Sequence, residues 1–236
     1  MNASIALRLA WKDIHLMRLP LAIYTAAALA GLALAATGGP VARSAGITLA
    51  LNVLIGVSFH VTLGPVLGER ERKTLAFVMS LPVAPRDTAA AKLLSSFLLF
   101  LVPGSAAAMA LVFLSPVNVF AAMATDHRSA LSHLAGWLAY FSLALGAWAL
   151  LFSVVLGAAI VSESLGWTIG VLTGLIFVLG NIVLQIAPRV GWVVRYARDL
   201  AHGGPALGAT LGVETAGIAL VVAATFLLQD RKTSFV

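Results

Sequence analysis

The chain has 236 residues, of which 61% are hydrophobic and only 10% are charged. A soluble domain is about half apolar and about a quarter charged, so this composition excludes a water-soluble enzyme and a disordered chain. The 15 Lys and Arg exceed the 9 Asp and Glu, giving a net charge of +6. In so apolar a chain, this surplus indicates basic loops that face anionic lipid. We therefore expect a multi-pass membrane protein that contacts membrane lipid and binds no nucleic acid.

The segment 1–18 is predicted to form a cytoplasmic interfacial helix. At 100° per residue, five of its polar side chains fall within an arc of about 120°. They are Ser4, Arg8, Lys12, His15 and Arg18. Mostly apolar residues occupy the rest of the circumference. A helix with one basic face and a wide apolar back suits the headgroup plane of a membrane.

Six apolar stretches follow, and most are close to the roughly 20 residues that cross a bilayer. They cover residues 19–36, 45–67, 89–114, 132–160, 166–187 and 208–228. The fold class is therefore expected to be an all-α integral membrane protein with six transmembrane helices within 19–228, followed by a cytoplasmic tail, 229–236. Asp87 or Thr88 is expected to cap the third span. A tight turn at 162–164 is expected to separate the fourth and fifth spans.

The loop charges predict the orientation in the membrane. Most Lys and Arg residues outside the spans fall on the side of the N-terminus, among them Arg70, Arg72 and Lys73. The positive-inside rule then places both termini in the cytoplasm. The segment 188–206 is expected to be an external re-entrant or interfacial segment. The Ala- and Leu-rich, Cys-free composition favours a bacterial inner membrane.

The most informative polar segment lies between the second and third predicted spans, at 68–87. Five consecutive charged residues, 69–73, precede Thr74 and the short apolar run Leu75–Leu81, which ends before Pro82. An apolar helical turn outside the membrane exposes hydrophobic surface to water unless another surface packs against it. It either folds back onto the membrane surface or fits a groove on a partner protein, and the residues alone do not decide between the two.

The order of residues in this segment resembles a known family. Glu-Arg-Glu-Arg-Lys-Thr-Leu at 69–75, Pro82-Val83-Ala84 and then Lys92 at the head of a span are similar to the permease subunits of type-2 ATP-binding-cassette (ABC) exporters. In that family a charged E-R-E-x-G-T-L sequence opens the coupling helix between spans two and three. Lys73 stands where the family usually has glycine. The motif-level similarity covers about residues 68–95.

The resemblance implies an exporter with separate motor subunits. Two permease copies, expected as a homodimer, pair in the membrane, and two cassette ATPase subunits bind their cytoplasmic face. ATP and Mg belong to those ATPase subunits, so this chain is expected to bind no cofactor and to be no enzyme. The expected ATPase-coupling residues are Glu69, Arg70, Glu71, Arg72, Lys73, Thr74, Leu75, Phe77, Val78, Leu81 and Pro82, with Glu163 as a second contact.

Polar residues inside the predicted spans are candidates for the substrate path because burying them in lipid costs free energy. Such residues include Ser95, Ser96 and Gln185, and the four candidates for the path are Asn52, His60, Asn181 and Glu214. For Asn52 and Asn181 the favoured interpretation is hydrogen bonding between helices. Glu214 is expected either to form a salt bridge to Arg195 or Arg198, or to bind a cationic substrate or gate its passage.

Catalytic and metal-binding motifs are missing from the sequence. No His-Glu-x-x-His or Gly-x-Ser-x-Gly pattern occurs, and the five histidines are scattered, so we expect no catalytic residue and no metal ligand. Three alternatives to the ABC exporter permease stay open. They are a heme-exporter-type permease, a membrane-embedded enzyme with unrecognised active residues, and a scaffold subunit without a substrate path.

Overall fold

The computed structural model describes residues 3–37, 39–64, 84–111, 130–162, 164–181 and 205–232. Within these ranges the chain forms seven α-helices and no strand. The helices are α1 (Ala3–Leu16), α2 (Arg18–Thr37), α3 (Pro40–Thr62), α6 (Pro85–Leu111), α8 (Ala130–Ser162), α9 (Leu165–Asn181) and α11 (Pro205–Lys232). The all-α prediction is therefore confirmed for the described residues.

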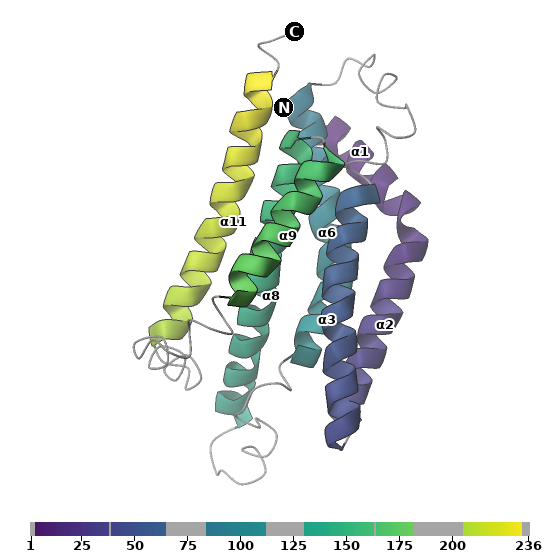
Figure 1. Cartoon of the computed structure of the whole chain (residues 1–236), viewed down its shortest axis with the longest axis vertical. Helices are drawn as coiled ribbons and strands as arrows, with labels where there is room; N and C mark the ends of the chain where they lie inside the picture. The colour runs from purple at the N-terminus through teal and green to yellow at the C-terminus, as the bar shows by residue number, and fades with distance from the viewer. Residues whose placement is uncertain are drawn as a thin grey trace.

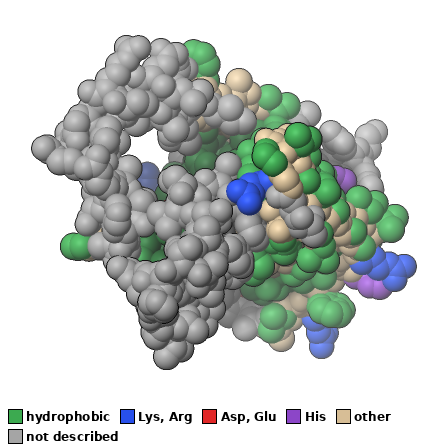
Figure 2. All heavy atoms as spheres, turned by 90° about the horizontal axis from the view of Figure 1, so that it is seen from below, with side chains coloured by type: hydrophobic (Ala, Val, Ile, Leu, Met, Phe, Trp, Pro, Cys, Tyr) green, Lys and Arg blue, Asp and Glu red, His purple; other side chains and the backbone are tan. Residues whose placement is uncertain are grey.

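Five of these helices, α2, α3, α6, α8 and α11, are long and apolar enough to cross a membrane. Their outer faces carry large hydrophobic side chains, as expected for helices that contact lipid; Leu220 on α11 is 71% exposed. Hydrophobic side chains also dominate the described surface seen from the lower end of the molecule (Figure 2). These features are consistent with a multi-pass membrane protein. The remaining predicted span, 166–187, is described only as far as Asn181, in the 17-residue helix α9.

The long helices run up and down one bundle, and α1 lies across its upper end (Figure 1). The first turn of α1 and the last turn of α11 lie at this same end, which we call the termini end. Helix α6 occupies the centre, packing against α1, α2, α3, α8 and α11. By contrast, α9 packs mainly against α8 and lies in front of it (Figure 1).

The core of the bundle is held by aromatic packing and by one very close helix pair. The Phe100 ring of α6 stacks on the Phe152 ring of α8, with centroids 4.6 Å apart. Helices α2 and α3 approach so closely that a Cβ atom on Gly46 would lie 2.5 Å from the backbone of both Gly31 and Ala35. Any side chain at Gly46 therefore forces these two helices apart.

Two helix starts differ from the sequence prediction because proline begins each helix earlier than the hydropathy suggests. Helix α3 starts at Pro40 rather than at residue 45, with Gly39 in an extended conformation before it. Helix α6 starts at Pro85 rather than at residue 89. Asp87 is therefore a buried residue inside the first turn, and its amide donates to the Ala84 carbonyl at 2.8 Å. The expectation that Asp87 or Thr88 caps this helix was wrong.

Candidate functional site

The residues expected to couple to an ATPase lie outside the described part of the chain. They are Glu69, Arg70, Glu71, Arg72, Lys73, Thr74, Leu75, Phe77, Val78, Leu81 and Pro82, and Glu163 between α8 and α9. The structure describes what borders them. In the chain the first group lies between the end of α3 and the first turn of α6, and Glu163 lies between α8 and α9.

A buried ion pair joins α1 to α6 at the termini end. The Lys92 ammonium lies 3.3 Å from Oδ2 of Asp13, and the two side chains are only 9% and 4% exposed. Helix α1 presents Asp13 to α6 because it shares one helix face with Ala6 and Ala10, which are also buried. The small alanine side chains let the two helices approach, with Ala91 of α6 packed against them.

Both carboxylate oxygens of Asp13 have neighbours that stabilise a negative charge. The Ser95 hydroxyl lies 3.4 Å from Oδ2, where it can donate to it, and 3.3 Å from the Lys92 carbonyl. The exposed ammonium of Lys12 lies 3.5 Å from Oδ1. A buried charge needs such compensation, and removing one partner of a buried pair is strongly destabilising. Asp13, Lys92 and Ser95 therefore fix the position of α1 on α6, and we call them the α1–α6 charge cluster.

Sequence reasoning missed the role of Asp13. It placed Lys92 at the head of the third span but identified no partner for it. The available signal was an acidic residue following Ala6 and Ala10 at the spacing of one helix face. An acid on the apolar side of an amphipathic helix requires a basic partner on the element that it packs against.

Another buried carboxylate, that of Glu214, lies on α11 against α8. The side chain fills the space beside Gly146, where a Cβ atom would overlap the carboxylate. Glu214 is 8% exposed, and its Oε2 atom has no hydrogen-bond partner among the described residues. Arg195 and Arg198, the expected salt-bridge partners, lie outside the described residues.

The other candidates for a substrate path do not gather around Glu214. Asn52 is exposed and donates to the Thr48 carbonyl in its own helix at 2.9 Å, so the expected hydrogen bond between helices was wrong for this residue. His60, also exposed, lies near the end of α3 with its ring edge-on to Tyr24, at a centroid distance of 5.8 Å. Asn181 is the last residue of α9, and its side chain is outside the described part.

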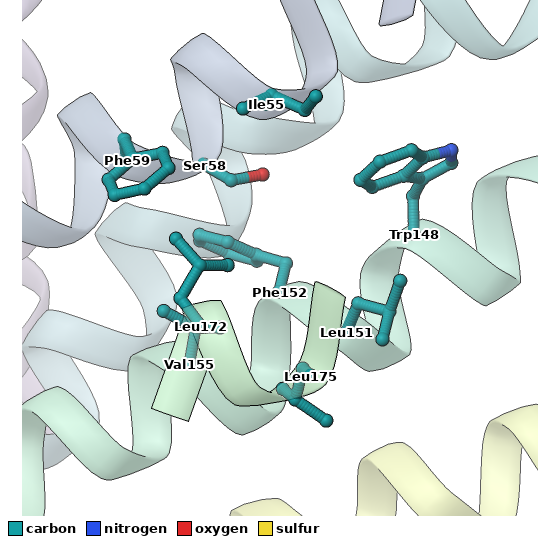
Figure 3. A pocket seen from close by; sticks show the side chains of 9 residues that line it. All are labelled: Ile55, Ser58, Phe59, Trp148, Leu151, Phe152, Val155, Leu172 and Leu175. Carbon is teal, nitrogen blue, oxygen red and sulfur yellow. The ribbon is translucent and has the colours of Figure 1, made fainter. Parts of the chain in front are cut away.

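An apolar cavity of about 250 Å³ lies between α3, α8 and α9 (Figure 3). Its lining includes Ile55 and Phe59 of α3, Phe152 and Val155 of α8, and Leu172 and Leu175 of α9. A second cavity, of about 290 Å³, lies on the other side of α9, between α8 and α11. The two cavities flank α9, in keeping with its packing mainly against α8.

The described residues contain no group of three or more His, Asp or Glu side chains that could hold a metal ion. The chemically distinctive features of the described residues are the α1–α6 charge cluster, the buried Glu214 carboxylate and the apolar cavity. In comparisons with known proteins, the chain matches no family model, no curated protein and no solved structure.

Proposed function

We propose that this chain is the permease subunit of an ATP-driven ABC exporter. Two copies form the substrate path in a bacterial inner membrane with both termini in the cytoplasm, and two cassette ATPase subunits supply ATP hydrolysis. The proposal rests on the resemblance over residues 68–95 and on the position of one residue of that resemblance. Lys92, the lysine that follows the charged motif, is the partner of Asp13 in the α1–α6 charge cluster.

That position suggests how a motor subunit acts on the membrane helices. The segment 68–87 leads directly into α6, and α6 packs against five other helices. Because the α1–α6 charge cluster fixes α1 to the first turns of α6, a force on the segment displaces both helices together. Glu69 to Arg72 contact the ATPase in this proposal, and Leu75, Phe77, Val78 and Leu81 fill its groove.

Glu214 is the proposed contact for a cationic group of the substrate within the path. A buried carboxylate in a transmembrane segment is costly, and such residues commonly face a substrate or ion pathway. We expect the Glu214→Gln variant to transport a cationic cargo more slowly than the wild type, and an unchanged rate excludes this role.

Co-purification tests the main proposal. The chain is co-expressed with each cassette ATPase of its source organism that lacks membrane spans. We expect one of these ATPases to bind the wild type, and Glu71→Ala and Phe77→Asp to abolish both binding and stimulation of ATP hydrolysis. Arg128 lies between the third and fourth predicted spans, which the predicted orientation places on the side opposite the termini. Arg128→Ala is the matched control and is expected to keep both. If no ATPase binds, or if both variants bind as the wild type does, the chain is not an ABC permease.

A further inference from the structure

The cavity between α3, α8 and α9 lies within helices that are apolar along their length. Its floor is Phe152, which is 2% exposed and is held in place by stacking on Phe100. Val155, the next lining residue one turn along α8, is 4% exposed. Ile55 of α3 is 38% exposed and therefore stands at the opening. The cavity is thus open at the surface and closed toward the core.

The described residues of the lining offer no free polar group to a ligand. Ser58 is the one hydroxyl residue among the lining residues that the structure describes, and its hydroxyl donates to the Leu54 carbonyl in its own helix at 2.7 Å. The indole nitrogen of Trp148 lies on the side of the ring away from the other lining residues (Figure 3). A water molecule needs two to four polar partners, so water is a poor occupant of this space.

We propose that this cavity binds the hydrocarbon chain of a membrane lipid or of a free fatty acid. Its volume of about 250 Å³ exceeds that of apolar protein cavities that stay dry and accept small hydrocarbons. An empty apolar void loses the dispersion contacts of its lining, and a flexible methylene chain restores them without needing a hydrogen bond. Bilayer chains surround helices that cross a membrane, so this ligand is present wherever the opening faces lipid. The inference does not depend on the proposed exporter function.

Photolabelling in lipid nanodiscs tests the proposal on the full chain. The probe is a phosphatidylcholine with a diazirine in the middle of one acyl chain. After irradiation, we expect labelled peptides around Ile55 and Leu172 to exceed labelled peptides around Leu220, which faces outward from α11. Excess unlabelled phosphatidylcholine competes if the bound chain belongs to a phospholipid, and excess oleate competes if it belongs to a free acid.

Two adjacent valines of α8 provide a matched pair of variants. Val155 lines this cavity, whereas Val154 lines the second cavity on the other side of α9. We expect Val155→Phe to lower the labelling near Ile55 and Leu172 by about tenfold, and Val154→Phe to leave it unchanged. Ile55→Trp, at the exposed opening, produces the same loss without changing a buried position, so it covers the case in which Val155→Phe fails to fold.

Three results overturn the proposal. The first is equal labelling near the cavity and near Leu220, and the second is labelling that neither competitor lowers. The third is labelling that survives both Val155→Phe and Ile55→Trp. Cross-links from the cavity residues to a second copy of the chain, in place of lipid adducts, overturn it in favour of a protein occupant.

Discussion

Asp13 and Glu214 are both buried acidic residues, yet the structure surrounds them in opposite ways. Asp13 lies among Lys92, Lys12 and Ser95, which can compensate both of its oxygens. Glu214 lies against the bare backbone of Gly146, and its Oε2 atom has no hydrogen-bond partner among the described residues. The first carboxylate serves to hold two helices together. The second lowers the stability of the contact it occupies, which is the pattern expected of a residue kept for function.

The largest loss of stability is expected from removing one partner of the Asp13–Lys92 ion pair. Lys92→Met leaves the Asp13 carboxylate buried without its principal cation, at a cost of about 3 kcal/mol. The thermal unfolding midpoint in detergent is expected to fall by about 6 °C or more. The double variant Asp13→Asn with Lys92→Met removes both charges, so it is expected to be more stable than Lys92→Met alone. If the double variant is as unstable as Lys92→Met, or if its loss of stability equals the sum of the two single losses, the two residues do not form a buried ion pair.

A smaller loss of stability is expected from a substitution at Gly146, where α8 packs against Glu214. Gly146→Ala introduces a Cβ atom that overlaps the carboxylate, and the side chain must move, at a cost of about 2 kcal/mol. Adding Glu214→Ala removes the overlap and should recover stability. Gly170→Ala on α9 is the control because, among the described residues, no atom outside the local α9 backbone lies within 4 Å of a Cβ there. Thermal unfolding of these three variants and the wild type measures the effect, and an unchanged midpoint for Gly146→Ala shows that the two helices are not in close contact.

Ser95→Ala probes the weakest member of the α1–α6 charge cluster. The hydroxyl is 3.4 Å from Asp13, near the limit for a hydrogen bond, so its loss is expected to cost about 1 kcal/mol. Ser142→Ala, whose hydroxyl donates only within α8, serves as the reference. The same unfolding measurement applies, and a loss equal to that of Lys92→Met contradicts the ranking of the two contacts.

The smallest effect is expected from changing Glu214 itself. Glu214→Gln has nearly the same shape and loses no ion pair among the described residues, so its unfolding midpoint is expected to equal or exceed that of the wild type. The same chemical change at the other acid, Asp13→Asn, is expected to lower the midpoint. A drop of similar size in both variants shows that Glu214 has a cationic partner outside the described residues, with Arg195 and Arg198 as the first to examine.

Hydropathy was sufficient to predict the five long apolar helices because an apolar run of about 20 residues is a strong local signal. The contacts between helices depend on how each helix is rotated, and hydropathy carries little of that information. Lys92 was identified without Asp13 for this reason, and Asn52 was expected to bond across helices whereas it bonds to Thr48 in its own helix. The cavity depends on how far α9 lies from α3, a distance that no residue pattern in either helix specifies.

The pairing of Asp13 with Lys92 also has a consequence for biosynthesis. The ribosome adds Asp13 long before Lys92, and the whole α2–α3 hairpin is made between them. Helix α1 therefore emerges with its acid lacking this lysine and can dock only after α6 has entered the membrane. The close contact of α2 with α3 at Gly31 and Gly46 joins two helices that are both made within that interval, so α1 docks on α6 only after both members of that contact have been made.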